Sequence, residues 1–224
     1  MKVIAVIPAR LTSKRLPKKV LKKIDKKNSI EIIYNKLLKI FNKKNIYVIT
    51  SNHISDDKLF NFCEKKKIRV FRGSLNNVFS RAQKLANLLK IDGILRINGD
   101  SPLIVNSDIK KALKIFKTKK YDLVTNIFPR TFPIGMSIEI IKAKALNLAA
   151  NKIYKKDDKE HLTKYFYRNF KNFKIFNIKK NKNYSKIHLA IDTLEDFKKV
   201  KKIYNNLKKK DSSFFQILNE YRKN

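Results

Sequence analysis

The sequence predicts an α/β fold in which helices cover both faces of a mostly parallel central sheet. Short apolar runs alternate with segments whose apolar residues recur at helical spacing. The first run, from Val3 to Ile7, is continuous and β-branched, as in a strand that is covered on both faces. Repeated β-α-β-α units of this kind form parallel sheets, and ligands bind beyond the carboxyl ends of their strands.

Each predicted element follows from its own pattern. The strands are expected at residues 3–7, 46–50, 69–72, 93–97, 123–125, 137–141, 174–178 and 187–191. The helices are expected at residues 29–41, 56–66, 77–89, 107–117, 143–151, 159–168 and 195–207. Ser29 can cap the first helix, and Val200, Ile203 and Leu207 lie on one stripe of the last.

The composition indicates one globular domain over residues 1–224. Hydrophobic residues make up 43% of the chain, enough to offset the entropy cost of ordering and to exclude a disordered chain. Four glycines and one cysteine exclude collagen-like and disulfide-stapled scaffolds. The lone Cys63 has no nearby His or Asp pattern, so it is interpreted as a packing residue and not as a nucleophile.

The formal net charge is +36, which would attract nucleic acid, anionic membranes or phosphorylated small molecules. The basic residues are spread from Lys2 to Lys223, which favours a diffuse basic surface over a dedicated nucleic-acid site. The first apolar run stops at Pro8, too early for a signal peptide, and no run approaches the ~20 apolar residues of a membrane helix. We therefore expect a cytoplasmic protein with no membrane insertion.

A basic loop follows the first predicted strand. Residues 8–19 contain five cationic side chains, two hydroxyls and two prolines. Arginine forks and lysine charges in such a loop can wrap a polyphosphate, although any loop of so basic a chain carries positive charge. The loop is not a Walker motif, because its glycines and the Gly-Lys-Ser/Thr ending are absent.

Asp100 and Asp192 each follow a predicted strand. Asp100 lies in a turn and, taken alone, is better explained as an Asp-type turn residue or a cap of the next helix than as a cation ligand. Thr193 and Asp196 form a capping-box pattern that does not require Asp192. If both carboxylates reach the same edge of the sheet, they suit Mg²⁺, which takes its other ligands from water and substrate phosphates.

Six segments resemble, in order, the cytidylyltransferases that activate sugar acids, including the 3-deoxy-manno-octulosonate and N-acylneuraminate enzymes. The most similar branch comprises the spore-coat polysaccharide biosynthesis enzymes. The segments are Ile7-Pro8-Ala9-Arg10 through Leu21, Phe71-Arg72-Gly73 through Arg81, Arg96 through Ile104, Phe132 through Glu139, Glu160-His161-Leu162-Thr163 and Ile191 through Phe197. The resemblance implies a Rossmann-like, glycosyltransferase-A-like nucleotidyltransferase fold.

The resemblance also implies a reaction and a site. CMP would pass from CTP to a sugar acid with release of pyrophosphate, for surface polysaccharide or lipopolysaccharide biosynthesis. Residues expected at the nucleotide are Pro8, Ala9, Arg10, Ser13, Arg15, Lys19, Gly99 and Asp100. Residues expected at the acceptor are Arg81, Gly135, Glu139, Glu160 and His161. Asp100 and Asp192 match the family's Mg²⁺ ligands, and Arg10 and Lys19 join them as catalytic residues; a homodimer is a further expectation.

The chain departs from the family pattern at two informative positions. Lys18 stands where the family usually has glycine, and Ser137 stands where an aspartate is common. Three alternatives stay open: a nucleotidyltransferase with another nucleotide or acceptor, a member that binds nucleotide without turnover, and a basic nucleic-acid-binding protein. His161 is interpreted either as an acid/base residue or as a helix residue, and His53 and His188 as structural, since neither has a partner at metal-ligand spacing.

Overall fold

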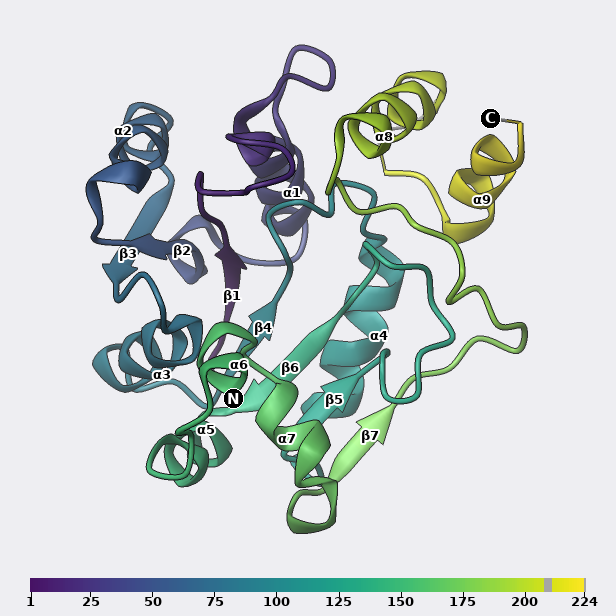
Figure 1. Cartoon of the computed structure of the whole chain (residues 1–224). Coiled ribbons are helices and arrows are strands. Elements are labelled where there is room, and N and C mark those ends of the chain that lie inside the picture. Colours follow the sequence, from purple (N-terminus) through teal and green to yellow (C-terminus); the bar gives the residue numbers. More distant parts are fainter. Residues whose placement is uncertain (208–210, 224) are drawn as a thin grey trace.

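The computed structural model of the protein describes residues 1–207 and 211–223. A seven-stranded sheet lies at the centre of the molecule (Figure 1). The strands are β1 (Val3–Pro8), β2 (Ile46–Ser51), β3 (Arg69–Gly73), β4 (Gly93–Arg96), β5 (Leu123–Thr125), β6 (Glu139–Lys142) and β7 (Ile175–Asn177). Their order across the sheet is β3-β2-β1-β4-β6-β5-β7. The predicted α/β class with a mostly parallel sheet is confirmed.

Helices cover both faces of this sheet. The α-helices are α1 (Ser29–Leu38), α2 (Asp57–Lys65), α3 (Val78–Leu88), α4 (Asn106–Phe116), α5 (Ala143–Ala150), α6 (Lys156–Glu160), α7 (Lys164–Arg168), α8 (Leu194–Asn206) and α9 (Phe214–Arg222). Single 3₁₀ turns lie at Lys19–Leu21, Lys43–Asn45, Ile54–Asp56 and Phe170–Asn172.

Two apolar cores result from the alternation of side chains along the strands. In β1, Ala5 and Ile7 face a core that includes α1, α2, α4, α8 and α9, whereas Ile4 and Val6 face a core that includes α3, α5 and α7. These four residues are 1% exposed or less. Burial on both faces explains why the first strand reads as a continuous apolar run and not as an alternating one.

The direction of β6 decides what lies at the ligand-binding edge. β1, β2, β3 and β4 run parallel, but β6 pairs antiparallel with both β4 and β5, with Arg96 opposite Glu139. Residues 126–138, which precede β6, therefore lie at the carboxyl end of β4, the same edge to which β1 leads.

Four expectations about elements need correction. Residues 187–191 form no strand: their pairing is the isolated bridge of His188 with Ile134. The strand expected at 137–141 begins at Glu139 and runs antiparallel. The helix expected at 159–168 is two short helices, because His161 has an extended backbone. Helix α9 was not predicted, although Ser213 begins it with a complete capping box.

Two further sequence interpretations concern buried and membrane-spanning segments. Cys63 is fully buried in α2, as expected of a packing residue, and burial raises the pKa of its thiol to about 12. Among the described residues, every helix is too short or too polar to span a bilayer.

Candidate functional site

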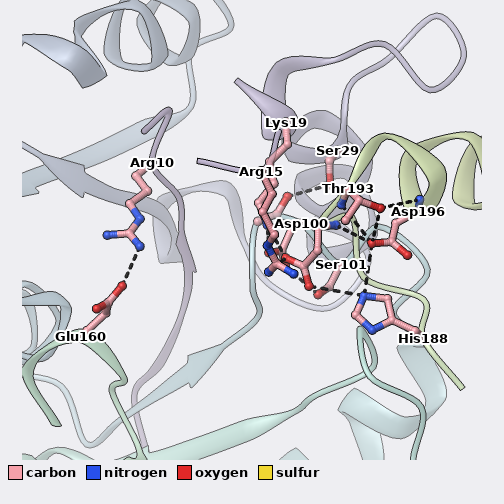
Figure 2. A network of polar contacts seen from close by, with 12 residues as sticks. Arg10, Arg15, Lys19, Ser29, Asp100, Ser101, Glu160, His188, Thr193 and Asp196 are labelled. Carbon is pink, nitrogen blue, oxygen red and sulfur yellow. Dashed lines mark hydrogen bonds and ion pairs between the residues drawn. The ribbon is translucent and has the colours of Figure 1, made fainter. Parts of the chain in front are cut away.

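The structure brings Asp100 and Asp192 together around one ammonium group. Lys19 Nζ donates to Asp100 Oδ2 at 2.7 Å and to Asp192 Oδ1 at 2.9 Å. Arg15 also reaches Asp192, with 3.2 Å between Nη2 and Oδ1. Figure 2 shows the side chains of Arg15, Lys19 and Asp100 gathered beside the start of α8. The carboxylates thus share one place at the carboxyl edge of the sheet.

The electrostatics of this cluster follow from its partly buried ion pairs. Burial alone would lower the pKa of Lys19, but Asp100 and then Asp192 outweigh it and raise that pKa. Burial alone would raise the pKa of Asp192, but Lys19, then Arg15 and His188, outweigh it and lower that pKa. Lys19 is therefore held as the cation and Asp192 as the anion at neutral pH.

Backbone contacts fix the two aspartates to one another. Ile191 N donates to the carbonyl of Asp100 at 2.9 Å, which ties the segment before α8 to the turn after β4. Thr193 begins α8 with a capping box whose other member is Asp196. The capping box predicted from sequence thus forms, and it leaves the Asp192 side chain free to face Lys19.

His188 lies in this cluster, which corrects its interpretation as a histidine without a suitable partner. Its Nε2 lies 3.3 Å from Asp192 Oδ2 and 3.6 Å from Asp196 Oδ2. The three side chains can present ligand atoms within 4.8 Å of one another. The sequence feature that indicates this contact is the four-residue spacing between His188 and Asp192. In the structure this spacing brings the two side chains together, although neither residue lies in a helix.

The basic loop after β1 extends across the sheet edge. Arg10 Nη2 donates to Glu160 Oε1 at 2.6 Å, and Figure 2 shows this pair apart from the Lys19 cluster. Ser13 is half-buried, and Arg15 and Lys18 are exposed. The loop therefore links the Asp100 side of the site to α6 through Arg10.

The base of the loop is closely packed. Gly99 N donates to the carbonyl of Pro8 at 3.1 Å, and Ala9 N donates to Ile49 O at 3.2 Å. A Cβ added to Gly99 would lie 3.0 Å from both Ala9 Cβ and Pro8 O. Glycine at position 99 thus lets the turn after β4 approach the start of the loop.

Asp56 anchors the loop, a role that no sequence pattern indicates. This fully buried carboxylate accepts from Leu11 N at 2.8 Å through Oδ1. Its Oδ2 accepts from the backbone N–H of Ser51 at 3.2 Å and from the Ser51 hydroxyl. The contact joins residues 45 positions apart, so no local pattern in the sequence marks it.

A cavity of about 260 Å³ opens at the carboxyl end of β4, next to Arg96 and Asn98. Asn98, two residues before Asp100, is part of its wall. The full lining comprises Arg96, Asn98, Ile127, Arg130, Ser137, His161, Thr163, Lys164 and Tyr167. The wall is strongly cationic, and its residues come from segments that precede and follow β6 in the sequence.

A family model described as cytidylyltransferase matches residues 4–223. The chain belongs to the cytidylyltransferase family. It is 27% identical over 212 residues to the spore coat polysaccharide biosynthesis protein SpsF of Bacillus subtilis, covering 90% of this chain and 86% of that protein. The fold and the sequence-based resemblance agree with this membership.

Solved structures extend the comparison. A cytidylyltransferase from Leptospira borgpetersenii superposes with a TM-score of 0.92 at 30% identity, covering 100% of this chain and 94% of that one. The CTP complex of CMP:2-keto-3-deoxy-manno-octonic acid synthetase superposes with a TM-score of 0.67 at 16% identity, covering 90% and 97% of the two chains. At that identity the second likeness shows the shared nucleotidyltransferase fold.

In this cytidylyltransferase, three residues expected at the acceptor are buried. Arg81 is 2% exposed and its Nη1 donates to Ile49 O at 3.4 Å, so it lies in the core and not in the cavity wall. Gly135 has φ +94, and a Cβ there would lie 2.4 Å from Ala190 N. Glu139 is fully buried beneath the cavity. Arg81 and Gly135 do not line the cavity, and their contact with the acceptor stays a prediction.

His161 lines the cavity, and Glu160 precedes it in the chain. His161 is an exposed cavity residue and its Nε2 lies 3.6 Å from Asp157 Oδ1. The Glu160 carboxylate accepts a hydrogen bond from Arg10. Two cavity arginines, Arg96 and Arg130, were not among the residues expected from sequence, because each gains its surroundings from segments distant in the chain.

The donor set of Asp100 and Asp192 fits a hard divalent cation. Two carboxylate oxygens already converge on one cationic atom, Lys19 Nζ, at hydrogen-bonding distance. Mg²⁺ prefers such oxygen ligands and takes the rest of its coordination shell from water and phosphate. The residues present are therefore consistent with a magnesium site in this position.

Proposed function

We propose that the protein transfers CMP from CTP to a sugar acid and releases pyrophosphate. The observation that carries the proposal is the convergence of Lys19, Asp100 and Asp192 at the carboxyl end of β4, beside a cationic cavity. Membership of the cytidylyltransferase family supports the nucleotide, and the charge of the cavity supports an acidic acceptor.

The nucleotide would lie along the loop of residues 8–19. Arg10, Arg15 and Lys19 provide three cations for the triphosphate, with Ser13 as a neutral donor. Pro8, Ala9 and Gly99 form the close-packed floor on which the nucleotide would rest. Lys19 would exchange a carboxylate contact for a phosphate contact when the nucleotide binds.

The acceptor hydroxyl oxygen would form a bond to the α-phosphorus of CTP while the bond from that phosphorus to the α,β-bridging oxygen breaks. The hydroxyl proton passes to solvent water, and the bridging oxygen leaves with pyrophosphate. Catalysis would arise from positioning and charge neutralisation, to which Arg10, Arg15 and Lys19 contribute. Asp100 and Asp192 would hold Mg²⁺, which supplies electrostatic stabilisation of the phosphate oxygens.

Pyrophosphate release from CTP, measured with Mg²⁺ and a panel of keto-deoxy sugar acids, tests the proposal. Asp100→Asn and Asp192→Asn each keep the side-chain volume but remove one negative charge, and each should lower turnover by about a hundredfold or more. The matched control is Asp108→Asn, which changes a carboxylate of α4 that pairs with Lys180. Wild-type turnover in both active-site variants would overturn the assignment of the metal ligands.

A second measurement separates the alternatives. Thermal unfolding with CTP, UTP, GTP or ATP plus Mg²⁺ should show the largest rise in Tm with CTP, because a ligand that binds only the folded state stabilises it. A nucleic-acid-binding protein would instead bind RNA with an affinity that falls steeply with salt and does not change in Asp100→Asn.

A further inference from the structure

The cavity at the carboxyl end of β4 has two guanidinium groups in its wall and one carboxylate beneath them. Fully buried Glu139 accepts from Arg96 Nη1 and, at 2.6 Å, from the Tyr167 hydroxyl. Burial, and then the proximity of Glu139, raises the pKa of Tyr167, so the phenol stays protonated and acts as a donor. The Glu139 carboxylate is thus committed to Arg96 and Tyr167.

Arg130 has neutral partners for its positive charge. Its Nη1 donates to Pro133 O at 3.3 Å, and its Nη2 donates to the Ser137 hydroxyl oxygen at 3.1 Å. Within residues 1–207 and 211–223, no carboxylate oxygen lies within ion-pair distance of this guanidinium. Burial lowers the pKa of Arg130 and nearby Glu139 opposes that shift, so the group stays charged at neutral pH.

The remaining cations of the wall have a counter-ion. Lys164 Nζ lies 2.5 Å from Asp157 Oδ2, and His161 lies near the same carboxylate. Arg96 is paired with Glu139, although its buried Nε has no hydrogen-bond partner. The described wall of the cavity is therefore short of one negative charge, and the deficit lies at Arg130.

We propose that Arg130 binds the carboxylate of the acceptor and makes the enzyme select acids over neutral sugars. This inference rests on the proposed function. A carboxylate supplies the single negative charge that the wall lacks, and its two oxygens match the fork of a guanidinium. A phosphate, with about two charges near neutral pH, would exceed the deficit.

Binding of a minimal acid tests this assignment without knowledge of the full acceptor. The probe is pyruvate, which carries the 2-oxo carboxylate of keto-deoxy sugar acids, and its uncharged partner is pyruvamide. Binding is followed by the shift of the Arg130 Nε–Hε signal in NMR spectra and by calorimetry. At the Arg130 signal, wild type should respond to pyruvate at a concentration at least about tenfold lower than to pyruvamide or inorganic phosphate.

Substitutions localise the effect. Arg130→Met should weaken pyruvate binding by about tenfold or more, and Arg130→Lys, which keeps the charge but not the fork, should restore part of it. Arg222→Met, which removes an exposed arginine from α9, is the matched control and should bind as wild type does. Equal binding of pyruvate by wild type and Arg130→Met, or no preference over pyruvamide or phosphate, would overturn the inference.

CTP binding to the same proteins separates the two proposals. The Tm increase that CTP and Mg²⁺ produce should be the same in Arg130→Met and in wild type, which also shows that the variant is folded. If wild type does not bind CTP, the proposed function fails, whether or not pyruvate binds. If CTP binds and the pyruvate result is negative, only the assignment of Arg130 fails.

Discussion

Lys19 Nζ lies 2.7 Å from Asp100 Oδ2 and 2.9 Å from Asp192 Oδ1, so a lysine ammonium occupies the point on which both carboxylates converge. The side chain of Lys19 is 13% exposed, and those of the aspartates are 23% and 21% exposed. A divalent cation and this ammonium would compete for the same oxygens. Binding of nucleotide phosphate, which offers Lys19 another anion, should therefore favour binding of the metal.

Lys19→Met tests this competition. Without nucleotide, the variant should bind Mn²⁺ about tenfold or more tightly than wild type, because a neighbouring positive charge is removed. The same variant should bind CTP more weakly, since a phosphate contact is lost. Electron paramagnetic resonance of free Mn²⁺ gives the first affinity and calorimetry gives the second.

Lys14→Met, on the exposed part of the same loop, is the control for the loss of one positive charge. Its Mn²⁺ affinity should stay close to that of wild type. An unchanged or weaker Mn²⁺ affinity in Lys19→Met would show that the ammonium does not compete with metal.

Asp56→Ala should destabilise the protein by about 2–4 kcal/mol, because the buried N–H groups of Leu11 and Ser51 lose their acceptor. CTP binding should weaken as well, since the loop loses its anchor. Urea unfolding measures the first effect and calorimetry the second. Asp57→Ala, which removes the neighbouring exposed partner of Arg72, should cost less than about 1 kcal/mol. Similar losses in both variants would contradict the anchoring role.

Lys36 should make stability depend on pH in alkaline solution. It is 5% exposed and its Nζ donates to Ile104 O at 2.7 Å; burial lowers its pKa from 10.5 to about 8. Between these values the unfolded chain binds a proton that the folded protein does not, so the free energy of unfolding rises with pH in that window. The full cost of burying the charge applies below pH 8. The total rise should be up to about 3 kcal/mol.

The measurement compares urea unfolding of wild type and Lys36→Met from pH 7 to pH 10.5. The difference between their unfolding free energies should change with pH in favour of wild type. Lys39→Met, which removes an exposed lysine one turn from Lys36 in sequence, should show no such change relative to wild type. A constant difference for Lys36→Met would mean that Lys36 titrates normally.

Lys18→Gly should stabilise the protein by up to about 1 kcal/mol. Lys18 has φ 56, the left-handed region in which a Cβ is unfavourable and glycine is not. Its backbone hydrogen bonds with Leu11 and Leu21 do not involve the side chain, so glycine keeps them. Thermal unfolding gives the change, with Lys14→Gly as the control that should not stabilise. A lower Tm for Lys18→Gly than for wild type would contradict this account.

Sequence patterns predicted the elements near the first four strands because β1, β2 and β4 are almost wholly buried and all four strands are bounded by polar turns. They also predicted the place where Asp100 and Asp192 meet, since both follow apolar runs. The direction of β6 could not be predicted, because the alternation of side chains is the same in parallel and antiparallel strands. Residues 187–191 have the composition of a strand, but they lie against Ile134 in a single bridge.

Other parts of the site depend on contacts between distant residues. Asp56 binds Leu11, and Arg96 pairs with Glu139 across 43 positions, so neither relationship leaves a local signal. Helix α9 differs, because Phe214, Ile217, Leu218 and Tyr221 have clear helical spacing after Ser213. The sequence pattern from Ser213 to Tyr221 is therefore sufficient to indicate this helix.

Because β6 runs in the reverse direction, the residues proposed to bind the nucleotide and those proposed to bind the acceptor belong to different segments of the sequence. Residues that would contact CTP come from the loop after β1 and the turn after β4, whereas Arg130 and Ser137 belong to the segment that enters β6. That segment is separate in sequence from the turn after β4 that carries Asp100. Exchange of residues 126–138 with the matching stretch of a relative should therefore transfer acceptor preference while the nucleotide preference stays the same, which offers a route by which such enzymes diversify.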